Sequence, residues 1–281
     1  MADGKTVLIT GSTDGVGRCV ARKLAKTGAR VLVHGRNRDR GETLVTEISR
    51  QGGQARFYQA DMSSLAEVRS LAQAIQRDES RLDVLINNAG IGTGGRGQRQ
   101  TSTDGHELRF AVNYLSVFLL TRLLLPLLKV SALNRIPSRI VNVSSVGQDA
   151  IDFSDVMLTR GYSGVRAYCQ SKLAEVMLTF DLAEELKNSN VTATCLHPAT
   201  YMDTTMVRMD GISPMSSVDD GAAPILHLAT SPETEGKTGL YFDRFRASRA
   251  HPQAYDTTAR ARLRALSFEL TALEPDVAVG S

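Results

Sequence analysis

The segment Thr6–Gly17 has the sequence TVLITGSTDGVG, and the Ala- and Leu-rich stretch Arg18–Lys26 follows it directly. A short β-prone run therefore enters a glycine-rich turn, which leads at once into a predicted helix. Glycines let the backbone approach a pyrophosphate closely, while the helix N-terminus offers free N–H groups and the positive end of its dipole. The spacing is G-x3-G-x-G, and because ordinary turns also collect glycine, the turn alone indicates a nucleotide site without establishing one.

Alternation of short strands with longer helical patterns continues along the chain. Because parallel strands need helix-length crossovers between them, this pattern is typical of a parallel sheet with both faces covered. We therefore predict one α/β domain over residues 1–281, with a doubly wound parallel sheet of the Rossmann type. The predicted strands are Thr6–Thr10, Val31–His34, Arg56–Gln59, Val84–Ile86, Ile140–Val143 and Val191–Leu196.

Three stretches stand apart from this alternation. Residues 90–105 are rich in glycine without a hydrophobic period, which predicts a surface loop. Residues 199–217 carry four methionines among Thr, Asp, Gly and Pro. We predict a mobile lid there that orders over an apolar ligand, and the alternative is that these methionines cap the core. Residues 243–281 are predicted to be a C-terminal tail.

The composition is that of an ordinary folded protein. Among 281 residues, 33 Lys and Arg against 30 Asp and Glu leave a net charge of +3, and 42% hydrophobic residues give no support to disorder or to nucleic-acid binding. The longest apolar stretch, Leu115–Leu128, contains Arg122 and Pro126 and is shorter than the roughly 20 residues of a membrane span. We expect no membrane span, no signal peptide, reduced cysteines and a cytoplasmic location.

An arginine follows the second predicted strand where an NAD site would hold a carboxylate. A guanidinium pairs with the 2′-phosphate of NADP, whereas Asp or Glu would repel it, so Arg36 together with Arg18 favours NADP over NAD. The alternative is that Arg36, Arg38 and Arg40 form the solvated start of a helix.

Tyr168 and Lys172 are four residues apart in a predicted helix, so their side chains share one face. A phenol is ordinarily a poor acid or base at neutral pH, and a neighbouring ammonium would stabilise its phenolate. The alternative is an aromatic residue beside a surface lysine. Ser144 and Ser145 end one strand and Asn87 ends another, at the edge where doubly wound sheets bind ligands.

Together these motifs resemble the short-chain dehydrogenase/reductase family, in its shorter single-domain branch, and are similar to its retinol-dehydrogenase-like members. The resemblance implies an oxidoreductase that interconverts a carbonyl and an alcohol. Together with the arginine after the second strand and the methionine-rich lid, it predicts an NADP(H)-dependent enzyme that acts on an apolar small molecule. The matching motifs, in order between Lys5 and Leu240, are TG-x3-G-x-G at 10–17, Asp61, NNAG at 87–90, Asn113, Ser145, Y-x3-K at 168–172 and His197-Pro198.

The resemblance implies a role for each matching residue. Tyr168 is the general acid and base, and Lys172 stabilises its phenolate and holds the nicotinamide ribose. Ser145 steadies the substrate carbonyl, and Asn113 supports a water-linked proton relay. The implied cofactor-binding residues are Gly11, Ser12, Thr13, Asp14, Gly15, Val16, Gly17, Arg36, Asp61, Met62, Asn88, Ala89, Gly90, Tyr168, Lys172, Pro198 and Thr204.

The sequence departs from the family pattern at His197-Pro198-Ala199, where Pro-Gly is usual, and the following threonine contact is ambiguous between Thr200, Thr204 and Thr205. Residues 146–165 are expected to line the substrate pocket together with the lid near Met202–Met215 and the C-terminal tail.

Three further expectations concern other classes of function and assembly. A catalytically silent nucleotide-binding regulator would lack Tyr168, Lys172 or Ser145, and an epimerase of the longer branch would carry G-x-x-G-x-x-G and a larger C-terminal domain. The family often self-associates through helices that match 107–129 and 168–187, although their apolar faces must also cover the sheet. No metal site is expected, because Cys195, His34, His106 and His227 are scattered along the sequence.

Overall fold

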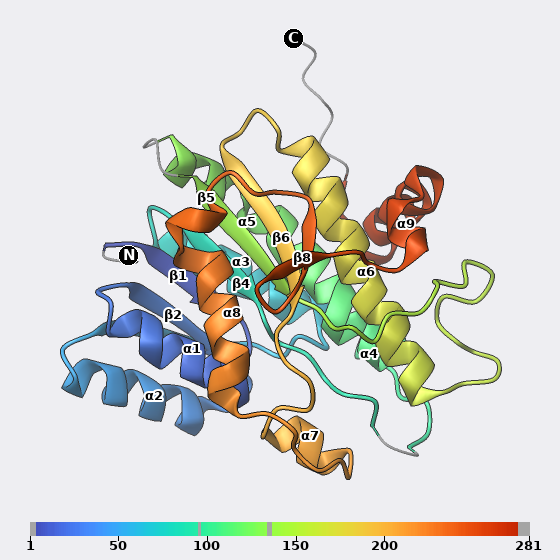
Figure 1. Ribbon diagram of the computed structural model, residues 1–281, viewed down its shortest axis with the longest axis horizontal. Coiled ribbons are helices and arrows are strands. Elements are labelled where there is room, and N and C mark those ends of the chain that lie inside the picture. Colours follow the sequence, from blue (N-terminus) through green and yellow to red (C-terminus); the bar gives the residue numbers. More distant parts are fainter. Residues whose placement is uncertain (1–3, 95–96, 134–136, 275–281) are drawn as a thin grey trace.

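An eight-stranded sheet forms the centre of the computed structural model, which describes residues 4–94, 97–133 and 137–274 (Figure 1). The strand order is β3-β2-β1-β4-β5-β6-β7-β8, and every neighbouring pair is parallel except β7 and β8. The strands are β1 (Thr6–Ile9), β2 (Arg30–Gly35), β3 (Gln54–Gln59), β4 (Val84–Asn87), β5 (Ser138–Val143), β6 (Val191–His197), β7 (Leu240–Asp243) and β8 (Arg246–Ser248).

Helices cover both faces of the sheet, with α1, α2 and α8 on one face and α3, α5 and α6 on the other. The longer helices are α1 (Gly15–Ala25), α2 (Arg38–Arg50), α3 (Leu65–Asp78), α5 (Ser116–Ala132), α6 (Gly164–Glu185), α8 (Val218–Thr230) and α9 (Thr257–Thr271). Shorter helical segments are α4 (Leu108–Phe110), the π-helix η1 (Ala111–Leu115), α7 (Thr205–Met209), and the 3-10 turns η2 (Pro232–Thr234) and η3 (Pro252–Tyr255).

Alternate residues of the central strands supply the two layers of the core. In β1, Leu8 packs into the cluster beneath α3, α5 and α6, whereas Val7 and Ile9 pack into the cluster beneath α1, α2 and α8. Both sets are fully buried. A strand that is buried on both faces is apolar along its whole length, which is why the run TVLI identifies a central parallel strand.

The strand order reverses between β1 and β4, because the chain first builds β2 and β3 on one side and then returns to build β4 to β7 on the other. In open α/β sheets, ligands bind at the carboxyl ends of the strands beside such a reversal, which here is where the loops after β1 and β4 begin. The predicted single, doubly wound α/β domain is therefore confirmed.

The C-terminal region differs from the predicted tail. Instead of a tail from residue 243, β8 pairs antiparallel with β7, and α9 packs against the body of the protein. The buried hydroxyls of Tyr114 and Ser267 lie 2.7 Å apart and join α9 to η1. The sequence pattern missed β7 and the three-residue strand β8, and residues 275–281 of the predicted tail lie outside the described residues.

Both long helices that were predicted near the site have different bounds. The segment 107–129 consists of α4, the π-helix η1 and α5, and α6 begins at Gly164, where the Ser163 side chain accepts a hydrogen bond from the backbone N–H of Arg166. Tyr168 therefore lies in the second turn of α6 and does not open it. The run Leu108–Ala132 is long and apolar enough by composition to cross a membrane, and 72% of its most apolar window is buried, as in the core helix of a folded domain.

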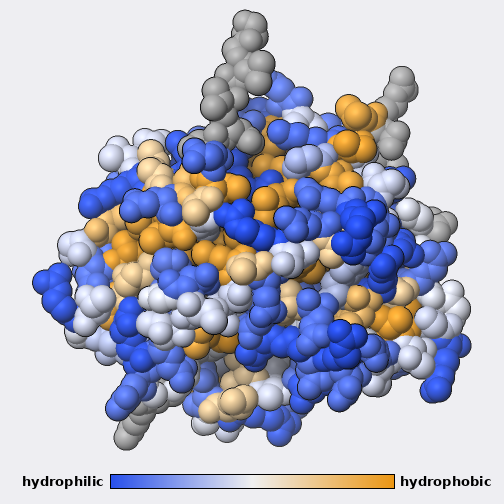
Figure 2. All heavy atoms as spheres, turned by 180° about the vertical axis from the view of Figure 1, so that it is seen from behind, coloured by the Kyte–Doolittle hydropathy of each residue, from blue (hydrophilic) through white to orange (hydrophobic). Residues whose placement is uncertain are grey.

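Apolar side chains reach the surface on the face opposite to that seen in Figure 1, where they form a broad area between hydrophilic margins (Figure 2). Leu123 and Leu127 of α5 and Leu266 of α9 are partly exposed. Much of α6 is covered by α9, whose Arg260 lies 3.5 Å from Asp181 in a nearly buried ion pair. Because α9 occupies part of this face, less of the α6 surface is free to contact a second copy of the chain than the family resemblance implies. The oligomeric state stays a prediction.

Candidate active site

The glycine-rich turn follows β1 and carries a backbone that only glycine fits. Gly11 and Gly15 have φ angles of +65° and +49°, in the left-handed region. A Cβ atom on Gly11 would lie 2.8 Å from the Cα of Ala89, and one on Gly17 would collide with the carbonyl oxygen of Gly11. The turn therefore presents glycine backbone directly before α1, whose first N–H groups have no partner within the helix. Such a cradle fits a pyrophosphate.

Two side chains that were not predicted to act in this way hold the turn in place. Asn88, predicted to bind cofactor, donates from its amide nitrogen to the carbonyl oxygens of Thr10 and Gly11 at 2.9 and 3.2 Å. His34 accepts a hydrogen bond from the backbone N–H of Gly11 at 3.0 Å, and burial lowers the pKa of His34 to about 4, which keeps it a neutral acceptor. The sequence carried no signal for the role of His34, because the contact depends on how β2 lies beside β1.

Arginine side chains lie beside the glycine-rich turn and at Asp61, two of the places where the cofactor was predicted to bind. Arg36 lies 3.5 Å from Asp61, and its side chain is 70% exposed. Burial alone would raise the pKa of Asp61, but hydrogen bonds from Ser63 and the charge of Arg36 hold it below its usual value. Arg18 pairs with Glu47 of α2, whereas Arg40 lies 3.2 Å from Asp14 in the glycine-rich turn. The structure thus places Arg36 and Arg40 near these positions, and it engages Arg18 elsewhere.

Ser145 and Tyr168 face each other across Gly147. A Cβ atom built on Gly147 would lie 3.5 Å from the Ser145 hydroxyl oxygen and 3.7 Å from the Tyr168 ring. The Ser145 oxygen accepts a hydrogen bond from the backbone N–H of Gly147, which leaves its proton free to be donated. Ser144 instead donates to the carbonyl oxygen of Lys172 at 2.8 Å. Of the two adjacent serines, Ser145 is therefore the one whose hydroxyl faces Tyr168.

Lys172 lies beside Tyr168 and is nearly buried. Its Nζ is 5.9 Å from the centre of the Tyr168 ring and donates to the carbonyl oxygen of Val143 at 2.9 Å. It also forms a 2.7 Å ion pair with Glu175, one turn further along α6. Burial alone would lower the pKa of Lys172, but the attraction of Glu175 and Tyr168 raises it above its usual value. Glu175 was not predicted as a site residue, although its spacing of three from Lys172 was a signal.

Asn113 lies in the π-helix η1 and connects the loop after β4 to α6. Its amide oxygen accepts from the backbone N–H of Ile91, and its amide nitrogen donates to the Ile91 carbonyl oxygen and to the Ser171 hydroxyl. A Cβ atom on Gly90 would lie 3.3 Å from the Asn113 oxygen and 3.6 Å from the Lys172 nitrogen. The four predicted catalytic residues are thus gathered at one edge of the sheet, close to the glycine-rich turn.

A family model for the short chain dehydrogenases matches residues 5–211. The chain belongs to the short-chain dehydrogenase family. It is 38% identical to retinol dehydrogenase 13 of Homo sapiens, over 96% of this chain and 86% of that protein. The retinol-dehydrogenase-like resemblance is therefore confirmed. This membership supports an oxidoreductase that acts on carbonyl and alcohol groups with a nicotinamide cofactor.

Solved structures of similar chains support the same fold. An uncharacterized protein from Mycobacterium paratuberculosis has a TM-score of 0.79 and 31% identity, over 97% of this chain and 95% of that chain. The RhlG/NADP active-site complex of Pseudomonas aeruginosa has a TM-score of 0.70 and 30% identity, over 86% of this chain and 96% of that chain.

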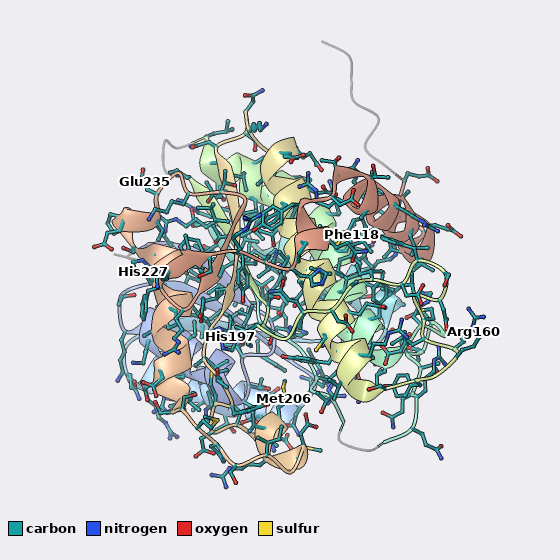
Figure 3. The ribbon with its side chains drawn as sticks, turned by 45° about the vertical axis from the view of Figure 1, so that its right-hand side comes forward. Phe118, Arg160, His197, Met206, His227 and Glu235 are labelled. Atoms are coloured by element: carbon teal, nitrogen blue, oxygen red, sulfur yellow. The ribbon has the colours of Figure 1, made fainter. Side chains whose placement is uncertain are left out.

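In this short-chain dehydrogenase the segment after β6 lies across the glycine-rich turn. A Cβ atom on Gly15 would lie 3.1 Å from the Thr204 methyl group, and the Thr205 hydroxyl donates to Asp14 at 2.9 Å. Thr200 is instead paired with His197 at the end of β6, and Figure 3 shows His197 there with α7 beyond it. Of the three candidate threonines, Thr204 therefore lies closest to the glycines. Pro198 and Met62, also predicted to bind cofactor, are buried.

The methionines of residues 199–217 mostly face solvent. Met209 and Met215 are 81% and 73% exposed, so the alternative that the methionines cap the core is wrong for them. The Asp210 carboxylate joins this segment to the loop after β4, because it accepts from the backbone N–H and hydroxyl of Thr93 and from the backbone N–H of Gly94, at 2.9 to 3.0 Å. No sequence signal links Asp210 to Thr93, which lies 117 residues earlier.

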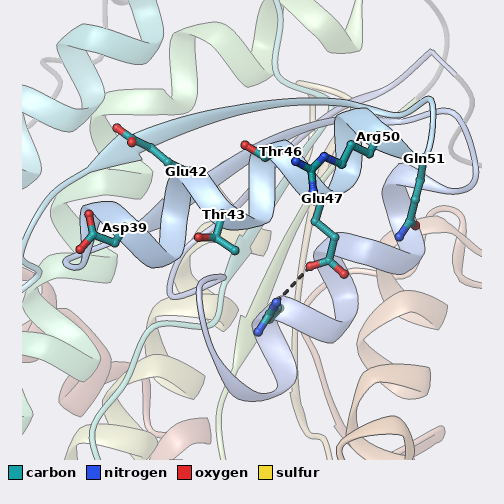
Figure 4. Close-up of a pocket in the computed structure, with 8 residues that line it drawn as sticks. Asp39, Glu42, Thr43, Thr46, Glu47, Arg50 and Gln51 are labelled. Carbon is teal, nitrogen blue, oxygen red and sulfur yellow. Dashed lines mark hydrogen bonds and ion pairs between the residues drawn. The ribbon is translucent and has the colours of Figure 1, made fainter.

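The larger of the two described grooves, about 760 Å³, lies away from this chemistry, between α1 and α2 (Figure 4). Acidic and basic side chains line it together, and Glu47 is already engaged by Arg18. Neither Tyr168 nor Lys172 borders it. Size alone therefore does not identify the active site of this dehydrogenase, and we assign the groove no role.

Proposed function

We propose that this short-chain dehydrogenase uses NADP(H) to interconvert a carbonyl and an alcohol on an apolar small molecule. The observation that carries the proposal is the convergence of Ser145, Tyr168 and Lys172 beside a glycine-rich cradle at the reversal of strand order. Nothing favours the catalytically silent regulator, because every residue that it was expected to lose is present and placed with the others.

The chain's own residues hold the substrate and move one proton. When bound, the nicotinamide supplies hydride to the carbonyl carbon, or accepts it from the alcohol. In reduction, Ser145 donates a hydrogen bond to the carbonyl oxygen and Tyr168 donates the proton that this oxygen gains. The Lys172 ammonium stabilises the phenolate that Tyr168 leaves behind. Asn113 fixes the loop after β4 against α6, so that the cofactor-binding loop and the proton donor Tyr168 keep their relative positions.

Three features support the choice of NADP and of an apolar substrate. Arg36 is largely exposed beside Asp61, and RhlG was solved with NADP. Val146, which follows Ser145, is 55% exposed, and Met209 and Met215 of the predicted lid are still more exposed. The name of the human relative, retinol dehydrogenase, denotes an apolar alcohol substrate.

A panel of carbonyl compounds tests the substrate class. With NADPH, kcat/KM should rise along a series of linear aldehydes and be lowest for small charged carbonyls such as glyoxylate. Each buried CH₂ contributes about 0.8 kcal/mol, so two more methylenes should give roughly a tenfold gain. Oxidation of NADPH measured by absorbance gives the rates. Efficient turnover of glyoxylate with none of the longer aldehydes would contradict the apolar substrate, and binding of NADPH without turnover of any compound would favour the silent regulator.

Asp210 provides a direct test of the predicted lid. In the protein without ligands, hydrogen exchange of residues 199–217 should be fast and should slow when NADP and a substrate analogue bind. Asp210→Ala should speed this exchange further, because three hydrogen bonds to Thr93 and Gly94 are lost. Asp203→Ala is the matched control, since Asp203 pairs with Arg208 within the same segment and does not join it to another loop. Equal protection with and without ligands would contradict gating.

A further inference from the structure

A fully buried carboxyl group lies beside Lys172, and no role has been given to it so far. Glu175 has no exposed side-chain surface, and its Oε2 lies 2.7 Å from the Lys172 Nζ. Among the described residues, its other oxygen, Oε1, has no hydrogen-bond partner. Buried polar atoms are nearly always paired, and buried ion pairs are often replaceable by apolar side chains without loss of stability. An unpaired carboxylate oxygen in the core is therefore a poor way to stabilise a helix.

The surroundings of Glu175 let it change charge near neutral pH. Burial raises the pKa of Glu175 to about 7, against the attraction of Lys172. Lys172 keeps its proton through this range, because Glu175 and Tyr168 raise its pKa although burial opposes them. On β6, burial raises the pKa of the Cys195 thiol and the charge of Glu175 raises it further, so this thiol stays neutral. Among the described residues, β5 contributes only the backbone carbonyl of Val143 to the Lys172 ammonium.

The charge on Glu175 determines how much of the Lys172 charge Tyr168 experiences. An ionised carboxylate within hydrogen-bonding distance of the ammonium opposes its field at the phenol, whereas a protonated carboxyl leaves that field intact. The interior screens such effects weakly, since effective dielectric constants there are far below that of water.

We propose that Glu175 is a positioning residue that holds the Lys172 ammonium and, by gaining or losing its own proton, sets how strongly this ammonium stabilises the Tyr168 phenolate. The proposal rests on the proposed function, in which Tyr168 exchanges the proton of the reaction. Glu175 itself touches neither the substrate nor the cofactor and acts through Lys172. The ionised form of Glu175, present at higher pH, weakens the stabilisation of the phenolate by Lys172, which favours carbonyl reduction over alcohol oxidation.

Glu175→Gln tests this proposal, because the amide keeps the shape and an oxygen acceptor for Lys172 but cannot ionise. The pH at which alcohol oxidation reaches half its maximal rate should fall by about one pH unit relative to the unaltered protein. Reduction should likewise decline at a lower pH. Below about pH 6, where Glu175 is protonated, the two proteins should have coincident profiles. Glu184→Gln, an exposed site on the same helix, is the matched control and should leave the profiles unchanged.

A second measurement needs no turnover and so separates this proposal from the proposed function. Infrared difference spectra of the protein without ligands should show a buried protonated carboxyl band that disappears as the pH rises through about 7, and the band should be missing in Glu175→Gln. If the unaltered protein shows no such titration between about pH 5 and pH 9, or if the rate profiles of the folded variant and the unaltered protein coincide or differ equally at all pH values, the proposal is wrong.

Discussion

Replacing Tyr168 with phenylalanine should lower kcat for carbonyl reduction by 10²-fold or more and leave the affinity for NADPH nearly unchanged. A positioned general acid typically contributes a factor of 10² to 10⁴, and the phenylalanine ring fills the same space without a proton to donate. The contact of Lys172 with the ring face is kept in this variant. Steady-state rates with a substrate from the aldehyde series, together with fluorescence titration of NADPH, measure both quantities.

Two companion variants separate the role of the proton donor from that of its neighbours. Lys172→Ala should harm both kcat and NADPH affinity, because Lys172 stabilises the phenolate in the proposed mechanism and, by the family resemblance, holds the nicotinamide ribose. Ser145→Ala should have a kcat between those of the other two variants. Tyr255→Phe is the control, since Tyr255 is 45% exposed and its hydroxyl accepts a hydrogen bond from the backbone N–H of Ala250, away from the site. A Tyr168→Phe protein that keeps more than about a tenth of the rate would overturn the assignment of the acid.

Much of the fold could be predicted because its determinants are local in the sequence. The β-prone run TVLI predicted a strand, and the glycines after it predicted a turn, whose left-handed backbone the structure shows at Gly11 and Gly15. The strands β7 and β8 gave no comparable signal. They are short, and β8 has the sequence RAS, so its pairing with β7 depends on tertiary context more than on its own residues.

The same distinction between local and long-range determinants applies to the candidate site. Tyr168 and Lys172 share a helix face, so their spacing alone predicted that they would be neighbours. The distance between Ser145 and Tyr168 depends instead on Gly147, where a larger side chain would enter the space between them. Asp210 and Thr93 meet although 117 residues separate them in the chain. The burial that raises the pKa of Glu175 comes from packing around it and has no counterpart in the sequence pattern.

Replacing Arg36 with aspartate should reverse the cofactor preference from NADP(H) to NAD(H). The guanidinium is 70% exposed beside Asp61, so it is free to turn toward a 2′-phosphate, and a charge-assisted pair of this kind is worth roughly 1.5–3 kcal/mol, or about tenfold to a hundredfold in affinity. An aspartate there repels the 2′-phosphate and accepts hydrogen bonds from the free ribose hydroxyl of NAD(H). Titration of both variants with NADPH and NADH measures the two dissociation constants.

A control is needed to distinguish the effect of the position of Arg36 from the effect of positive charge at the start of α2. Arg38→Asp makes the same change of charge two residues later, where the side chain pairs with Glu42 on α2, and it should lower NADPH affinity far less than Arg36→Asp does. The difference should shrink as salt is added, because the ion pair lies at the surface. Equal losses in the two variants would mean that the arginines act only as a diffuse positive field. Equal affinity of the unaltered protein for NADPH and NADH would contradict the NADP(H) preference itself, since Arg36 would then make no bond to the 2′-phosphate.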